Sequence, residues 1–362
     1  MIICQECFSD QILKSEIIGR KNTDKCDICL KDGFVYNTNK DDYLELFFNP
    51  FLDIFSPYNE ISNFPMEKGK LLKTEIATNW DIFTTCDEEI IYKIISEICK
   101  EKFKLKPTLL NSIIGIRKMY DSNYFSKHSL LKGDWEDFVN DLKYNNRFHS
   151  NHFNKGLLKK YCSTMIKYYD KGQEFYRCRI SQNDVELPKE KMGPPPKDKA
   201  TDGRANSLGI SRLYLGDSEK TTIHETRTGL YDNVCIAKFR LKEKMIVVDF
   251  KRINKISPFQ EYLVDDISEL AINKKYLEKI DLEMGRVMRK DDNPLDYVPT
   301  QYIADFVKSI ISEENENNKN LYDGIEFRSV MNPGGYNLAI FNPDLFEVVQ
   351  VKSKKISHIS YE

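Results

Sequence analysis

After residue 40, apolar residues first recur with a helical period. The clearest stripe comprises Ile90, Ile91, Ile94, Ile95 and Ile98. These positions repeat at the spacing of a helix with one buried face, which Cys86 or Asp87 would begin. Further helices are predicted over 134–148 and over a segment that ends at Gly172. Residues 41–172 are therefore expected to form a mostly helical domain.

From residue 173 the pattern changes to short runs of β-branched and aromatic residues, which are typical of strands. These runs occupy 174–180, 212–216, 235–241, 245–250, 336–341 and 346–351. Two helices are expected between them, over 218–227 and 299–311. The segment 187–206 contains three consecutive prolines, so it is expected to be a loop. Residues 173–362 are therefore expected to form an α/β domain of the α+β type.

Composition narrows the classes of protein to which the chain can belong. Its charges nearly cancel, at a formal net charge of -2, so the chain as a whole lacks the positive charge typical of nucleic-acid binding. No run of about 18 apolar residues is present, as a membrane span would need. The N-terminal residues lack the basic and apolar segments of a secretory signal. We therefore expect a cytoplasmic protein that does not bind membranes.

Four of the nine cysteines form two CxxC pairs, Cys4 with Cys7 and Cys26 with Cys29. Two such pairs can place four thiolates around one zinc ion. A shell of four thiolates leaves no open position, so the zinc would be structural rather than catalytic. The alternative is that the four cysteines pack as small apolar residues. We expect a zinc-knuckle region, or small zinc ribbon, over residues 1–40 in a reducing compartment.

An arginine stands in a glycine-containing turn in "TDGRANSLG", where Gly203 precedes Arg204. Such a turn lets a ligand approach the backbone closely, and its arginine is suited to bind a phosphate or pyrophosphate. The helix that follows carries Glu225 on the same face as Thr221 and Thr222. Because these neighbours are small and polar, this face of the helix, and Glu225 with it, is not expected to pack against a hydrophobic core. Helix geometry alone nevertheless favours a surface glutamate paired with a lysine.

Polar residues also stand within or at the end of two other strands. Arg177 and Arg179 share one face of a strand, where each would need an anion to offset the cost of burial. Near the C-terminus a strand, a polar turn and a second strand follow one another, and Ser329 stands where the first strand ends. A polar group therefore recurs at the end of a strand or in a turn.

The order of these segments resembles the RES-domain family, which is named for an arginine, a glutamate and a serine and includes toxins of bacterial toxin–antitoxin pairs. The resemblance rests on "YRCR", "MGPPPKDKATDGRANSLGISRLYLGDSEKTTIHETR", "YVPTQYIADFVK" and "DGIEFRSVMNPGGYNLAIF". It covers residues 173–352 and implies a fold similar to that of ADP-ribosyltransferases, with NAD as the substrate. Residues 41–172, which contain "WEDFVNDLKYNNRF", resemble the helical HEPN-type domain that precedes some RES domains.

The three residues that give the family its name fall on Arg177, Glu225 and Ser329. Family members cleave the nicotinamide–ribose bond of NAD by phosphorolysis or hydrolysis. This cleavage passes through an oxocarbenium-like state that a carboxylate can stabilise, which is the role expected of Glu225. Ser329 would position the nicotinamide ribose or the attacking nucleophile. Nicotinamide leaves as a neutral molecule, so no catalytic histidine is required.

The resemblance extends to three further positions and departs from the family at a fourth. Arg204 matches the arginine of the family's Gly-Arg turn and would hold the pyrophosphate together with Arg177. Tyr214 matches an aromatic residue before the glutamate helix and would stack on a ring of the ligand. Asn337 matches the asparagine after the glycines, and Ser207 stands where proline is expected.

Three other functions are left open. Some family members transfer ADP-ribose to a protein. A ribonuclease of the HEPN type is indicated by the R-x4-H spacing of Arg147 and His152, although packing of Phe148 and Phe153 at a helix end explains the same segment. A non-catalytic nucleotide sensor is the third. The partners expected besides NAD are an antitoxin or other inhibitory protein and further copies of the chain, and nucleic acid is left open.

Overall fold

The computed structural model describes residues 1–181, 185–260, 267–287, 293–312 and 320–358. The chain divides into two compact units. The first comprises Met1–Ser129 with Lys255–Lys274, and the second comprises Leu130–Asn254 with Lys275–Glu362. None of the helices among the described residues is long and apolar enough to cross a membrane.

Two small antiparallel sheets and several short helices make up the first unit. The sheets have the strand orders β1-β3-β2 and β4-β6-β5. The strands are β1 (Ile2–Cys4), β2 (Thr23–Lys25), β3 (Asp32–Asn37), β4 (Phe55–Pro57), β5 (Lys70–Leu71) and β6 (Ile113–Ile116). The helices are α1 (Gln11–Gly19), α2 (Glu45–Asp53), α3 (Leu72–Asn79), α4 (Glu88–Ile98), α5 (Lys100–Leu105), α6 (Thr108–Asn111) and α7 (Ser122–His128).

The strongest helical stripe forms α4, as its spacing predicts. The Asp87 carboxylate accepts hydrogen bonds from the backbone N–H groups of Glu89 and Ile90 and so begins the helix. The residues that α4 buries are Ile91, Ile94, Ile95 and Ile98. Burial of each such side chain is worth about 1.5–3 kcal/mol relative to exposure, so tertiary packing reinforces the local helical preference.

The helix predicted to end at Gly172 is shorter than expected. Helix α9 (Lys155–Thr164) gives way to strand β7 (Ile166–Tyr169), which pairs antiparallel with β11 (Met245–Asp249). A short apolar run is compatible with both periods, and pairing with a distant strand decides the outcome here. The helix predicted over 134–148 forms only in part, because α8 (Trp135–Asn140) continues as one π-helical segment to Asn145 and then ends.

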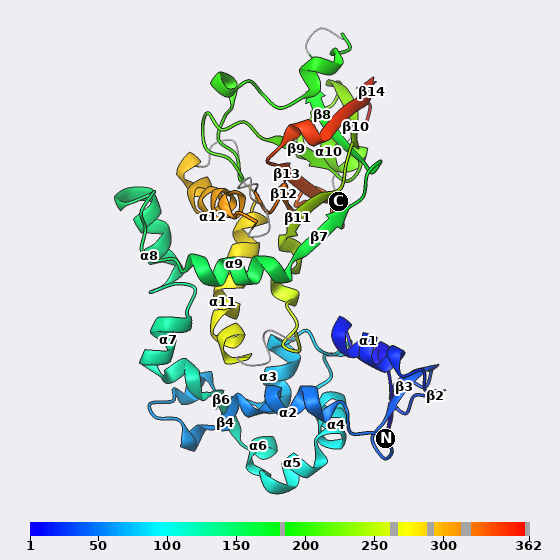
Figure 1. Ribbon diagram of the computed structural model, residues 1–362, viewed down its shortest axis with the longest axis vertical. Helices are drawn as coiled ribbons and strands as arrows, with labels where there is room; N and C mark the ends of the chain where they lie inside the picture. The colour runs from blue at the N-terminus through cyan, green and yellow to red at the C-terminus, as the bar shows by residue number, and fades with distance from the viewer. Residues whose placement is uncertain (182–184, 261–266, 288–292, 313–319, 359–362) are drawn as a thin grey trace. The chain divides into compact units, whose positions relative to one another are not determined.

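Eight strands form the sheet of the second unit, in the order β14-β10-β8-β9-β13-β12-β11-β7 (Figure 1). Among the described strands of this sheet, only β11 and β12 are parallel neighbours. The remaining strands are β8 (Glu174–Ile180), β9 (Leu213–Gly216), β10 (Asn233–Leu241), β12 (Gly324–Arg328), β13 (Tyr336–Ile340) and β14 (Phe346–Lys355). The strand runs predicted after residue 173 are confirmed, and the fold is mixed α/β.

Three further helices lie between these strands in the sequence: α10 (Glu219–Glu225), α11 (Ile267–Met284) and α12 (Val298–Ser309). Helices α10 and α12 lie where the sequence predicts them. Helix α11 was not predicted, because its buried residues include the polar Ser268, Glu269, Asn273 and Asp281. These residues interrupt the apolar stripe by which a buried helix is normally found.

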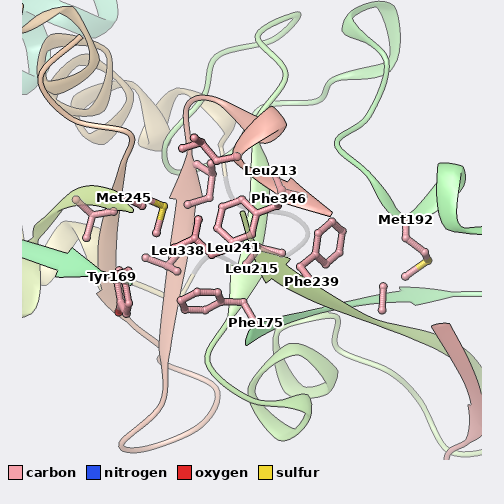
Figure 2. Close-up of a cluster of buried hydrophobic side chains, with 14 of the residues drawn as sticks. Tyr169, Phe175, Met192, Leu213, Leu215, Phe239, Leu241, Met245, Leu338 and Phe346 are labelled. Atoms are coloured by element: carbon pink, nitrogen blue, oxygen red, sulfur yellow. The ribbon is translucent and has the colours of Figure 1, made fainter. Parts of the chain in front are cut away.

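One face of the large sheet is covered by apolar side chains (Figure 2). The cluster includes Tyr169, Phe175, Leu213, Leu215, Phe239, Leu241, Met245, Leu338 and Phe346. Successive residues of a strand point to opposite faces. Tyr214 therefore points away from the core that Leu213 and Leu215 join, and Asn337 points away from the core that Leu338 joins. Tyr214 and Asn337 therefore belong to the face of the sheet opposite this apolar cluster.

Candidate active site

A cavity of about 1070 Å³ opens in the second unit beside β8, β9, α10 and β13. Its lining includes Arg177, Arg204, Tyr214, Glu225 and Asn337. The structure thus brings five of the six predicted ligand-binding and catalytic residues to one cavity. Ser329, the sixth, is 6% exposed and reaches the site through a hydrogen bond to Glu225.

Glu225 ends helix α10, and one of its carboxylate oxygens is fixed by two donors. The Ser329 hydroxyl donates to Glu225 Oε1 at 2.6 Å, and the Asn337 side-chain amide donates to the same oxygen at 2.9 Å. The Ser329 hydroxyl also accepts a hydrogen bond from the backbone N–H of Asn332 at 3.1 Å, so its single hydrogen is directed to Glu225. Glu225 is therefore held as an acceptor by one oxygen, and in the described part of the chain Oε2 makes no hydrogen bond.

A second layer of hydrogen bonds holds the turn that contains Ser329. Thr221 is fully buried; its hydroxyl donates to the Asp217 carboxylate at 2.5 Å and accepts from the Asn332 side chain at 2.8 Å. A Cβ on Gly335 would lie 2.5 Å from the Thr221 hydroxyl, so only glycine allows this approach. Sequence reasoning missed Asn332, although it lies in the same polar turn as Ser329.

Arg177, on β8, is a half-buried cation beside the cavity. Its Nη1 donates to the backbone carbonyl of Tyr214 at 3.3 Å, and its Nε is buried without a hydrogen-bond partner. Burial, together with the positive charge of the neighbouring Arg179, lowers the pKa of Arg177 to about 10. Among the described residues no carboxylate forms an ion pair with Arg177, so its charge is available to an anionic ligand.

Arg204 supplies a second cation from the loop before β9. Its guanidinium lies over the Phe327 ring at 5.5 Å and donates to the backbone carbonyl of Arg286. Burial lowers the pKa of Arg204, whereas the negative charge of Glu225 raises it. Its Nε, too, is buried without a partner in the described structure. Two desolvated arginines therefore border the cavity, which is the arrangement expected of an anion-binding site.

Tyr214 has a contact that its sequence position did not reveal. Its hydroxyl donates to Asn206 Oδ1 at 2.7 Å and accepts from the backbone N–H of Ala205 at 3.0 Å. Burial raises the pKa of Tyr214 to about 12, so the phenol is neutral. The hydroxyl holds the Arg204 turn, while the residue also lines the cavity. Stacking of this ring on a ligand stays a prediction.

The four N-terminal cysteines form a separate cluster in the first unit. Their sulfur atoms all lie within 4.8 Å of one another, at 3.8 Å for Cys4 and Cys7, 3.4 Å for Cys4 and Cys29, and 3.6 Å for Cys7 and Cys26. A zinc ion with Zn–S bonds of about 2.3 Å in a tetrahedron holds its sulfurs about 3.8 Å apart. The backbone N–H groups of Cys4 and Ile28 also point to Cys26 Sγ. The cluster therefore fits a zinc ion, which these four residues would hold in a closed structural shell.

Arg147 and His152 lie in the irregular segment between α8 and α9. Arg147 is exposed and donates through Nε to the Leu142 carbonyl at 3.3 Å, and His152 is half-buried. Phe153 packs against Phe138 at 5.1 Å between ring centroids, but Phe148 is 78% exposed. The packing explanation for this segment is thus correct for Phe153 and wrong for Phe148.

The family model of the RES domain matches residues 174–361, which is more than half of the chain. The chain therefore belongs to the RES-domain family. The matched range contains the residues named above as lining the cavity, and membership is consistent with an NAD-related function of the toxin type. Comparison with curated proteins and with solved structures finds no match.

Proposed function

We propose that the protein is an NAD-consuming enzyme that cleaves the nicotinamide–ribose bond by phosphorolysis or hydrolysis. The observation that carries the proposal is that one cavity holds an oriented carboxylate and two arginines that form no ion pair with any described residue. Glu225 is fixed through Oε1 by Ser329 and Asn337, and Arg177 and Arg204 border the same space. The cavity volume of about 1070 Å³ leaves room for a dinucleotide and an acceptor.

The residue types suit each stage of this reaction. When the N-glycosidic bond breaks, its electron pair leaves with nicotinamide and the ribose develops positive charge, which the Glu225 carboxylate would stabilise. Phosphate or water then forms the new bond to the ribose carbon. Arg177 and Arg204 would hold the pyrophosphate through charge-assisted hydrogen bonds. Transfer of ADP-ribose to a protein, as in ADP-ribosyltransferases, would use the same residues with a protein side chain as acceptor.

Incubation of the purified protein with NAD, with and without inorganic phosphate, tests the proposal. We expect free nicotinamide to be released. An enzyme that works by hydrolysis would form ADP-ribose with or without phosphate, and one that works by phosphorolysis would form ADP-ribose phosphate only when phosphate is present. Labelled NAD and cell extract would reveal a protein acceptor as label on macromolecules. No release of nicotinamide under any of these conditions would overturn the proposed function.

Replacing Arg177 by methionine is expected to raise KM for NAD by about 10- to 100-fold. A hydrogen bond to a charged group contributes about 1.5–3 kcal/mol, and each 1.4 kcal/mol corresponds to about a tenfold change in affinity. Arg240→Met is the matched control, because Arg240 lies on the adjacent strand β10 but pairs with Glu174 at 3.1 Å. Steady-state kinetics would measure both variants, and equal KM values for the two would contradict a role of Arg177 in binding.

A further inference from the structure

The turn that carries Arg204 is held by a residue of a different element, Gln301 of helix α12. Gln301 is 5% exposed. Its Nε2 donates to the carbonyls of Gly203 and Asn206, each at 3.0 Å, and approaches Asp202 Oδ1 at 3.4 Å. A buried side-chain amide that donates hydrogen bonds to backbone carbonyls of another segment holds the two segments together.

The orientation of this amide is fixed by Ser207. The Ser207 hydroxyl donates to Gln301 Oε1 at 3.2 Å, so the amide nitrogen must point to the carbonyls on the other side. Ser207 is also the position where the RES resemblance leads one to expect proline, which could not form this bond. The hydroxyl of this chain therefore completes a contact that a proline at the same position would lack.

Gln301 binds the turn on both sides of Arg204. The turn closes on itself through Gly203 N to Asn206 O at 2.9 Å, and Tyr214 holds Ala205 and Asn206 from β9. A Cβ on Gly203 would lie 2.6 Å from the Asn206 side chain, so the backbone is tightly packed here. Between these two anchors stands Arg204, which lines the cavity.

Helix α12 also packs against other residues of the same unit through Tyr302. Tyr302, the neighbour of Gln301, packs edge-on against Phe138 and Phe153, at 5.8 and 5.9 Å between ring centroids. Lys155 Nζ lies 5.6 Å from the centre of the same ring. These three partners precede the range matched by the family model. One side of α12 is thus anchored to them, while Gln301 reaches the active-site turn.

We propose that Gln301 is a positioning residue that holds the guanidinium of Arg204 in place for the pyrophosphate of the substrate. The inference rests on the proposed function, because Arg204 is taken to bind that pyrophosphate. Arg204 is desolvated and its Nε lacks a partner in the described structure. The guanidinium contacts the Arg286 carbonyl and the Phe327 ring, and no carboxylate forms an ion pair with it among the described residues. The position from which this side chain starts is set by the backbone of the turn, which Gln301 holds.

Gln301→Met tests this role, because methionine keeps the length and volume of the side chain but can form none of these hydrogen bonds. We expect the dissociation constant for ADP-ribose and KM for NAD to rise about tenfold, the effect of losing one well-placed ionic hydrogen bond, with kcat changed less than KM. Gln350→Met is the matched control, because Gln350 is exposed on β14. The control is expected to behave as the wild type.

A double-mutant cycle separates positioning from general loss of structure. If Gln301 acts through Arg204, then Gln301→Met added to Arg204→Met will weaken ADP-ribose binding no further. Amide hydrogen exchange in residues 203–208 should be faster in Gln301→Met than in Gln350→Met, without any substrate present. Additive losses in the cycle, or unchanged exchange of the turn, would overturn the inference. If the cycle is non-additive for ADP-ribose binding but the wild-type protein releases no nicotinamide from NAD, the proposed function alone would be overturned.

Discussion

Glu225→Gln is expected to lower kcat for NAD cleavage by about 10³-fold, the scale of losing a group that stabilises transition-state charge. The glutamine oxygen can still accept the hydrogen bonds from Ser329 and Asn337 that fix Oε1. The arrangement of the cavity should therefore persist while the negative charge is lost. Because that charge acts on the ribose cation rather than on the bound dinucleotide, affinity for NAD should change much less than kcat.

Glu219→Gln provides the control for this variant. Glu219 lies on the same helix α10, but it pairs with Lys352 at 2.7 Å instead of lining the cavity. Nicotinamide release and NAD binding would be measured for both proteins, together with their thermal unfolding. A Glu225→Gln protein that retains folding and cleaves NAD within tenfold of the control would exclude a catalytic role for this carboxylate.

Removal of zinc is expected to have the largest effect on stability. Binding of a structural zinc by thiolates contributes about 10–16 kcal/mol to the folding of small zinc domains. The secondary structure around the cysteine cluster is short and includes strands β1–β3 and helix α1. Cys26→Ser should therefore lose the metal and unfold this region, because Cys26 also receives the N–H groups of Cys4 and Ile28.

Metal analysis of the purified protein measures this directly. We expect about one zinc ion per chain in the wild type, in keeping with one closed four-thiolate shell, and none in Cys26→Ser. Cys86→Ser is the control, because Cys86 is an exposed cysteine of the same unit outside the cluster. Limited proteolysis should cut residues 1–40 faster in Cys26→Ser and in protein treated with a chelator. A wild-type protein without zinc, or equal proteolysis of all samples, would contradict the zinc assignment.

Local features of the sequence determined much of the fold. The spacing of the CxxC pairs predicted the cysteine cluster, and Asp87 and the isoleucine stripe predicted α4. The runs of β-branched and aromatic residues predicted the strands of the second unit. Each of these signals lies within a few residues of the element that it specifies, so a single sequence is enough to find it.

The contacts that complete the site depend on residues far apart in the chain. Glu225 lies 104 residues before Ser329 and 112 before Asn337, and Gln301 lies 98 residues after the Gly203 carbonyl that it binds. Helical position alone favoured a surface role for Glu225, and nothing in the spacing linked Gln301 to Arg204. The neighbouring positions of β9, β13 and β12 in the sheet bring Glu225, Ser329 and Asn337 together, whereas helix α12 carries Gln301 to the Arg204 turn.

The sequence by itself therefore determined where strands, turns and the CxxC pairs lie and which polar residues stand at them, because those signals are local. Tertiary structure alone decided that 166–169 is a strand, since β7 forms by pairing with β11. It alone also decided which oxygen of Glu225 is fixed and which residue holds the Arg204 turn. Hydrogen-bond partners are selected by the distance between atoms in the folded chain, and sheet order sets that distance.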